Sequence, residues 1–161
     1  MRKCATKATL FVTLGAVALA GASATAANAA TATDTAHAKS ALLTIQAFGE
    51  QYKVRANDPA VIKRAVELMK NGPTENGANI PHGQIVKGAS KDNPAYSTWR
   101  KDEYGHWLQP WHINPANFKF SEVSSKGCDE APSDLWRNNI AWKMGYLCPW
   151  GGKVVKVQLA E

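Results

Sequence analysis

The sequence predicts a small α+β domain in which one antiparallel sheet carries two helices on one face. Three observations lead to this fold class. Several stretches alternate apolar and polar residues as strands do, two segments have helical periodicity with capping signals, and the elements follow the order β-β-α-β-β-α-β. The part from Lys39 onward is about 120 residues long, the usual size for one hydrophobic core. We therefore expect a single domain over residues 39–161.

The first 29 residues have the three regions of a secretory signal peptide. Basic residues precede an apolar run from Ala8 to about Ala20, and small residues follow it. We place the cleavage site after Ala29, although small-x-small patterns also occur a few residues earlier. The apolar run is shorter than the ~20 residues that span a bilayer. We therefore expect a secreted protein without a membrane anchor, in which residues 30–38 form a flexible leader.

The charge of the chain does not indicate a nucleic-acid partner. Loss of Arg2, Lys3 and Lys7 with the signal lowers the formal net charge from +6 to about +3. The remaining basic residues are scattered and form no run that could follow a phosphate backbone.

Two cysteines, Cys128 and Cys148, remain after the signal is removed. Because the extracellular compartment is oxidising, we expect them to form a disulfide. On the chain-entropy model, closing a loop of roughly 20 residues contributes about 3 kcal/mol to the free energy of unfolding.

The amino-terminal half of the domain predicts a hairpin followed by a helix. Ala41–Ala47 and Gln51–Ala56 alternate like strands, with Gly49-Glu50 as the turn between them. Asp58 and Pro59 then form a helix start signal, and the helical period continues to Asn71, where Gly72 and Pro73 end it.

The second half predicts three strands, a helix and a terminal strand. Asn114-Pro115 imposes a turn between the second and third strands, and Ser133 is positioned to cap the helix. The helix carries an apolar stripe that we expect to face the core. The predicted elements are strands over Gly83–Lys87, Trp107–Ile113 and Phe118–Val123, a helix over Asp134–Met144, and a strand over Lys153–Leu159.

The aromatic residues are the best candidates for a binding surface. All six tryptophans lie between Trp99 and Trp150, and so small a core cannot bury all of them. Pro149 and the disulfide stiffen the loop that carries Trp150. We therefore predict that Trp150, with Pro149 and helped by Trp99 or Trp111, contacts a protein partner.

The histidines give little support for an enzyme. His82, His106 and His112 could act as metal ligands or as a general base, with Asp129 or Glu122 as partner, but their spacing fits no metal motif. No nucleophile elbow and no phosphate-binding loop is present. We expect no metal, no cofactor and no enzymatic activity.

Five segments of the chain carry a resemblance to a known family. They are YKVRANDPAVIKRAVELMKNG (Tyr52–Gly72), HGQIVKG (His82–Gly88), WHINPANFKFSE (Trp111–Glu122), GCD (Gly127–Asp129) and LCPW (Leu147–Trp150). Together they resemble a family of small secreted bacterial domains labelled "calmodulin-binding protein", a label taken from a eukaryotic relative. The resemblance implies the same strand and helix order and a binding function. Two departures are Lys126-Gly127, where the family has Glu-Val, and Gly151-Gly152, where it often has serines.

Three functions follow as hypotheses. The first is an extracellular protein-binding module whose partner is undefined. The second is an inhibitor of secreted proteases that presents Cys148–Lys153 or Gly88–Arg100 to the protease cleft. The third is a small hydrolase that uses His106 or His112.

Overall fold

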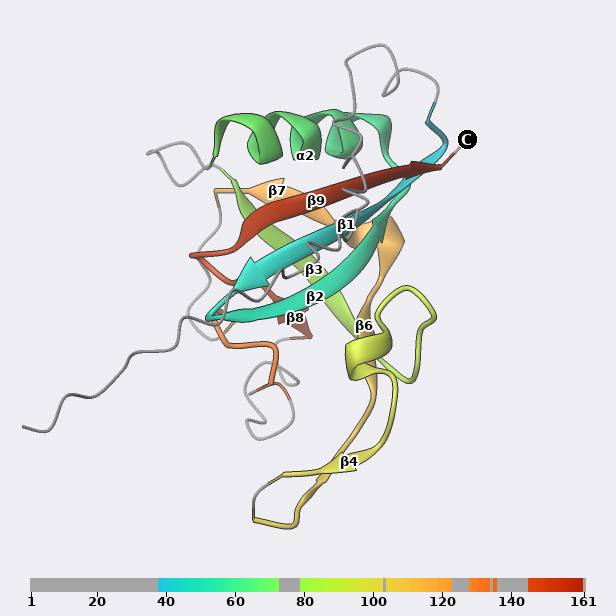
Figure 1. Cartoon of the computed structure of the whole chain (residues 1–161), viewed down its shortest axis with the longest axis vertical. Helices are drawn as coiled ribbons and strands as arrows, with labels where there is room; N and C mark the ends of the chain where they lie inside the picture. Colours follow the sequence, from blue (N-terminus) through green and yellow to red (C-terminus); the bar gives the residue numbers. More distant parts are fainter. Residues whose placement is uncertain are drawn as a thin grey trace, which may run out of the picture.

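The computed structural model describes residues 38–72, 79–102, 104–122, 128–133, 135 and 145–160. Within these residues nine strands form three antiparallel sheets, and Pro59–Asn71 (α2) is the one α-helix (Figure 1). The prediction of an α+β fold with two helices on one sheet was therefore wrong, because the fold is mostly β. The second helix, expected over Asp134–Met144, lies outside the described residues except for Leu135, which is fully buried.

The first sheet is built on β1 (Ser40–Ala47), which lies between β2 (Glu50–Ala56) and β9 (Lys153–Ala160). These three strands confirm the predicted ones to within a residue or two. The β1–β9 register shifts between Thr44 and Ile45, so that Val155 is an extra, exposed residue in β9. This bulge explains why alternation in the last strand is imperfect.

Two residues with positive φ, Phe48 and Gly49, form the turn between β1 and β2. This turn therefore lies one residue before the predicted Gly49-Glu50. Positive φ at both central residues is the type I′ hairpin geometry, which favours Asn-Gly. Phe48 has its aromatic side chain exposed there, at a position where the backbone is strained for a bulky residue.

Helix α2 confirms the predicted capping pattern. The Asp58 side chain accepts a hydrogen bond from the Ala60 N–H, Pro59 occupies the first turn, and Gly72 ends the helix. The buried face of α2 packs mainly against β9, as Figure 1 shows. This face consists of Val61, Ile62, Ala65, Val66 and Leu68.

The second sheet is organised around β3 (Ile80–Lys87), which uses both of its edges. On one edge it pairs with β6 (Trp111–Ile113) and β7 (Lys119–Ser121), and on the other with β8 (Tyr146–Leu147). The hydrogen bonds show the two edges directly. The Gln84 carbonyl accepts from the Asn114 N–H, whereas the next residue, Ile85, donates its N–H to Gly145.

The sequence pattern did not reveal the first three residues of β3, because Pro81 resembles a loop residue. The backbone N–H and C=O groups of successive residues in a strand point to opposite edges. The backbone of Pro81 therefore faces the β8 edge, beyond the two residues of β8 that pair with β3. Its missing N–H therefore costs no ladder hydrogen bond. Gly83 is required in the same strand, because a Cβ there would lie 2.2 Å from Cγ2 of Ile113.

The predicted strand Trp107–Ile113 is divided in two. Gln109 and Pro110 separate β5 (Trp107–Leu108) from β6, and β5 pairs instead with β4 (Arg100–Lys101). The resulting hairpin is the third sheet, and it projects away from the two larger sheets (Figure 1). The Asn114-Pro115 turn is confirmed as a short 3-10 helix, η2 (Pro115–Asn117), between β6 and β7.

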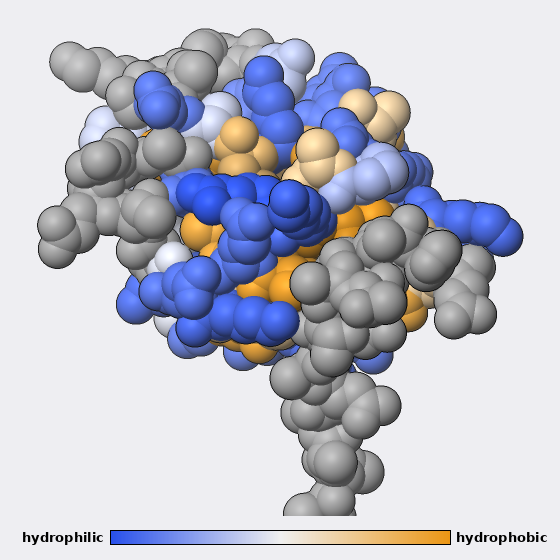
Figure 2. Space-filling model, turned by 90° about the horizontal axis from the view of Figure 1, so that it is seen from above, coloured by the Kyte–Doolittle hydropathy of each residue, from blue (hydrophilic) through white to orange (hydrophobic). Residues whose placement is uncertain are grey.

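The core lies between the two larger sheets and α2, and Trp111 is its largest fully buried side chain. Figure 2 views the molecule from the α2 side and shows mostly hydrophilic residues with hydrophobic ones between them. No helix within the described residues is long and apolar enough to cross a bilayer.

The predicted disulfide between Cys128 and Cys148 is present, with the two Cα atoms 5.0 Å apart. The Cys148 N–H also donates to the Cys128 carbonyl at 2.7 Å. Both cysteines are fully buried beside Ile80. The bond therefore joins the segment 128–133 to the end of β8.

Candidate functional site

The β4–β5 hairpin presents one face to the domain and the other to solvent. Its register places Arg100 opposite Leu108 and Lys101 opposite Trp107. Leu108 is buried, and the Arg100 guanidinium lies 5.5 Å from the centre of the Tyr96 ring. Because paired residues share a face and successive residues alternate, Lys101 and Trp107 lie on the opposite, outer face.

The outer face of the hairpin carries two exposed indole rings and a cation. Trp107 is 64% exposed, and the Lys101 ammonium group lies 4.9 Å from the centre of its ring. Trp99, two residues before Lys101, is 59% exposed. We name Trp99, Lys101, Tyr104 and Trp107 the hairpin surface. Rings of this size left in water are typical of a binding site.

Hydrogen bonds fix the tip of the hairpin. The Asp102 carboxylate accepts from the backbone N–H groups of Tyr104 and His106, at 2.9 and 2.8 Å, and lies 3.1 Å from His106 Nδ1. Burial alone would raise the pKa of the Asp102 carboxyl, but these contacts with His106 and Tyr104 outweigh it and lower that pKa. Tyr104 is exposed above this turn.

The loop that precedes the hairpin is attached to β2. Asn93 is buried and accepts a hydrogen bond from the Lys53 N–H at 3.0 Å. Two residues further along β2, the Arg55 guanidinium binds both carboxylate oxygens of Asp92, at 2.6 and 2.8 Å. The hydrogen bond to Arg55 lowers the pKa of the Asp92 carboxyl.

Tyr96 lies in a 3-10 turn, η1 (Pro94–Tyr96), and links this loop to the core. Its ring is buried against Trp111, with the ring centres 4.8 Å apart, and its hydroxyl donates to Glu50 at 2.9 Å. Burial, followed by this hydrogen bond, raises the pKa of Tyr96. The hairpin therefore rises from a base that is packed and hydrogen-bonded.

The predicted binding residues do not form one site. Trp111 is fully buried between Tyr52 and Tyr96 and belongs to the core, and Pro149 is buried as well. Trp99 and Trp150 are both more than half exposed.

Trp99 and Trp150 lie near opposite ends of β3. Trp150 follows the disulfide, and its backbone N–H donates to the Asp129 carboxylate at 2.8 Å. A Cβ on Gly152, two residues later, would lie 2.7 Å from Pro81 near the start of β3. The hairpin segment instead leaves the end of β3, where the Gly88 N–H donates to the Pro110 carbonyl. The two tryptophans therefore belong to separate surfaces.

The three histidines of the domain lie apart. His106 is at the hairpin tip beside Asp102, the His112 ring nitrogen Nδ1 lies 3.1 Å from the Gly88 carbonyl, and His82 stacks on Tyr146. In the part of the chain that the structure describes, no three His, Cys, Asp or Glu side chains are grouped to hold a metal ion.

The sequence prediction overlooked Lys101, Tyr104 and Trp107 as a surface because it assigned Trp107 to a long strand. The sequence does contain a signal for this hairpin. Asp102 and Gly105 are turn-forming residues flanked by Trp99 and Trp107, which is the pattern of a short hairpin with aromatic sides.

These features define a class: a small, mostly β domain with one disulfide and an exposed aromatic hairpin. Residues 38–160 match the family model described as the BP-74 N-terminal domain, and the chain belongs to this calmodulin-binding-protein-like family. The resemblance found in the sequence is thereby confirmed at the level of the family. No curated protein and no solved structure matches the chain.

Proposed function

We propose that the domain is a secreted, non-enzymatic protein-binding module that contacts its partner through the hairpin surface. The observation that carries this proposal is the pair of exposed tryptophans, Trp99 and Trp107, on a ribbon that projects from the domain. The family supports a calmodulin-binding-like domain in general terms. The sequence pattern of the first 29 residues supports secretion.

Burial of the two indole rings would supply much of the binding energy. A Trp side chain buries about 150–250 Å², and apolar area contributes about 25 cal/mol per Å². Trp99 and Trp107, already more than half exposed, therefore match the hot-spot scale of about 2 kcal/mol each.

The chemistry of the outer face indicates the kind of partner. Two flat apolar rings require an apolar groove. The Lys101 ammonium group near the Trp107 ring requires an acidic residue at the edge of that groove. The partner that fits is a protein with an apolar groove bordered by carboxylates.

The hairpin loses little conformational freedom on binding. Its tip is fixed by Asp102, and its base is fixed by Asn93 and Tyr96. A pre-ordered surface pays a smaller entropic cost for association.

The structure bears on one of the two segments proposed for protease inhibition. Gly88–Arg100 folds inward around Asn93, and the Ser97 hydroxyl shares its hydrogen between the Ser90 and Asn93 carbonyls, at 2.6 and 2.7 Å. This segment therefore lacks the extended shape that an inhibitory loop needs. The other segment, Cys148–Lys153, carries the exposed Trp150 and stays the candidate loop of the inhibitor hypothesis.

The test measures two kinds of binding. In the first, the domain is titrated with calcium-loaded calmodulin, which has an apolar groove with acidic edges. In the second, the immobilised domain captures proteins from culture medium, and the captured proteins are identified. Trp107→Ala and Trp99→Ala should each weaken binding by at least tenfold while the melting temperature stays within a few degrees. Trp150→Ala is the matched control, since it removes an indole that is also more than half exposed, from a separate surface. If only Trp150→Ala weakens binding, the binding site is the turn after the disulfide and the hairpin proposal is wrong.

A further inference from the structure

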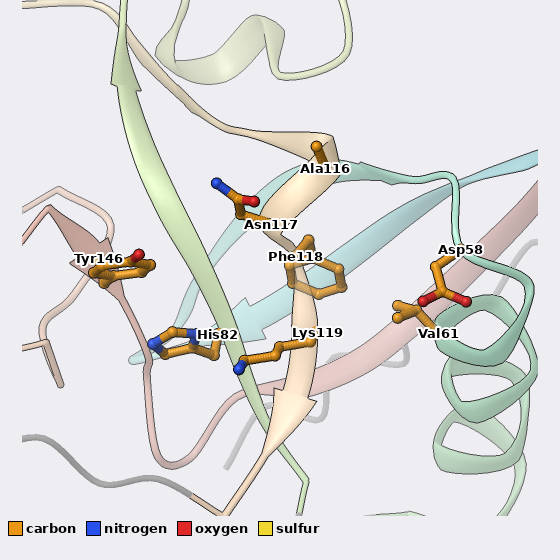
Figure 3. Close-up of a pocket in the computed structure, with 8 residues that line it drawn as sticks. All are labelled: Asp58, Val61, His82, Ala116, Asn117, Phe118, Lys119 and Tyr146. Atoms are coloured by element: carbon orange, nitrogen blue, oxygen red, sulfur yellow. The ribbon is translucent and has the colours of Figure 1, made fainter.

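A hollow of about 360 Å³ lies beside η2 (Figure 3). It lies between the first turn of α2, the η2–β7 segment, and the paired residues His82 of β3 and Tyr146 of β8. Alternation along β3 explains which side chains reach it. Gly83 and Ile85 are buried, whereas His82 and Gln84 lie on the other face of the sheet.

One end of the hollow is a flat aromatic platform. The rings of His82 and Tyr146 stack with their centres 4.8 Å apart and their planes at 15°, and Tyr146 is partly exposed. The two residues come from neighbouring strands, so the sheet holds the stack in place. A flat, partly exposed ring at the end of a hollow suits a ligand that has a flat ring of its own.

The hollow also contains a cation, Lys119. Lys119 is paired directly with His82 across β3 and β7, and Figure 3 shows its ammonium group directed toward His82. Among the described residues, no carboxylate lies within ion-pair distance of Lys119. Asp58, the carboxylate among the described lining residues, accepts a hydrogen bond from the Ala60 N–H and so caps α2.

His82 adds a second unsatisfied group. Its Nδ1 atom is buried, and no described residue forms a hydrogen bond with it. Burial, together with the charge of Lys119, lowers the pKa of His82, so its ring is neutral at neutral pH. We assign its proton to Nε2, because this avoids a buried unpaired donor at Nδ1.

Two apolar side chains also line the hollow. Phe118 and Val61, from η2–β7 and α2, are buried and present only a small apolar area beside the polar groups. A mixed polar and apolar lining with a cation at one side suits a small ligand that is both aromatic and charged.

We propose that this hollow binds a small organic anion with a flat ring, an aromatic carboxylate, whose ring lies beside Tyr146 and whose carboxylate pairs with Lys119. This site is distinct from the hairpin surface and does not depend on the proposed function. It gives a role in binding to His82, Lys119 and Tyr146, which are not part of the hairpin surface.

The proposed site also predicts that anion binding depends on pH. The groups that face His82 are Lys119 from β7, Tyr146 from β8, and Asp58 across the hollow from α2. A bound carboxylate offsets the Lys119 charge and raises the pKa of His82. By linkage, the affinity for the anion increases as the pH falls through the range in which His82 takes up a proton.

The experiment follows the folded domain by NMR during titration with three probes. Phenylacetate carries both the ring and the carboxylate, acetate lacks the ring, and 2-phenylethanol lacks the charge. Phenylacetate should bind at least tenfold more tightly than either of the others. Saturation with phenylacetate, but not with 2-phenylethanol, should raise the pKa of His82.

Variants then locate the site. Lys119→Gln and Tyr146→Ala should each weaken phenylacetate binding by about tenfold, the effect expected from loss of a charge-assisted contact or a ring contact. Lys119→Arg should retain binding, and Lys153→Gln, at an exposed position of β9, is the matched control. Equal affinity for acetate and phenylacetate, an equal effect of Lys153→Gln, or no saturable binding would overturn the proposal. Circular dichroism melting checks that each variant is folded.

Discussion

Arg55 and Asp92 form a two-pronged ion pair that connects β2 to the loop before the hairpin. Because the hydrogen bond to Arg55 lowers the pKa of Asp92, the pair stabilises the fold above the unfolded-state pKa of about 4. This contribution is lost as the pH falls through the lower, folded-state pKa. Asp92→Asn should therefore reduce the free energy of unfolding at pH 7 by about 1 kcal/mol. Urea titrations should show this difference shrinking toward pH 3, and a difference independent of pH would contradict the assignment.

Trp111 and Trp107 should respond in opposite ways to truncation. Trp111→Ala leaves a large cavity between Tyr52 and Tyr96, and large-to-small changes of this kind cost about 3–5 kcal/mol. Trp107→Ala removes an exposed ring and should cost less than about 1 kcal/mol. Thermal unfolding of both variants tests the placement of the two rings. Comparable losses would show that the Trp107 ring is packed against the domain.

The disulfide should contribute substantially to stability. It joins residues 20 apart in the sequence and ties the segment 128–133 to β8. Replacing Cys128 and Cys148 with alanine should lower the free energy of unfolding by about 2–4 kcal/mol. Thiol labelling of the native protein should detect no free cysteine in the domain. A stable variant with an unchanged unfolding midpoint would show that the bond has no structural role.

Phe48 should be replaceable with a gain in stability. Its backbone has φ of 52°, a region that asparagine adopts more readily than a bulky aromatic residue. Phe48→Asn should raise the free energy of unfolding by about 0.5–1 kcal/mol. Because the side chain is exposed, no packing should be lost. A lower melting temperature would indicate that Phe48 makes a contact that compensates for its strain.

Local signals in the sequence were sufficient for the long elements. Capping by Asp58 and Pro59 predicted α2, and alternation predicted β1, β2 and β9, because these segments are long enough to show a period. The strands β4 to β8 have two or three residues each, too few for any periodicity. The pairing of β6, β7 and β8 depends on β3, and Pro81 concealed the beginning of that strand.

The candidate sites were predictable only in part. Composition showed that some tryptophans had to be exposed, and Trp99 and Trp150 are. Composition could not show that Trp111 is buried and Trp107 exposed. Both lie in one apolar stretch, Trp107 before Pro110 and Trp111 after it. The hollow beside Tyr146 was not predictable, since its residues come from four segments far apart in the sequence.

The hydrogen bond between Gly88 and Pro110 has a consequence for how specificity could change in this domain. It brings the two ends of the segment 89–109 together at the edge of the second sheet, so this segment leaves and rejoins the sheet at one point. Within it, Asn93 and Tyr96 are fastened to the body, whereas residues 99–107 make up the part that projects. On the proposal that this surface binds a protein, substitutions or insertions within residues 99–107 should change the partner while the core stays the same.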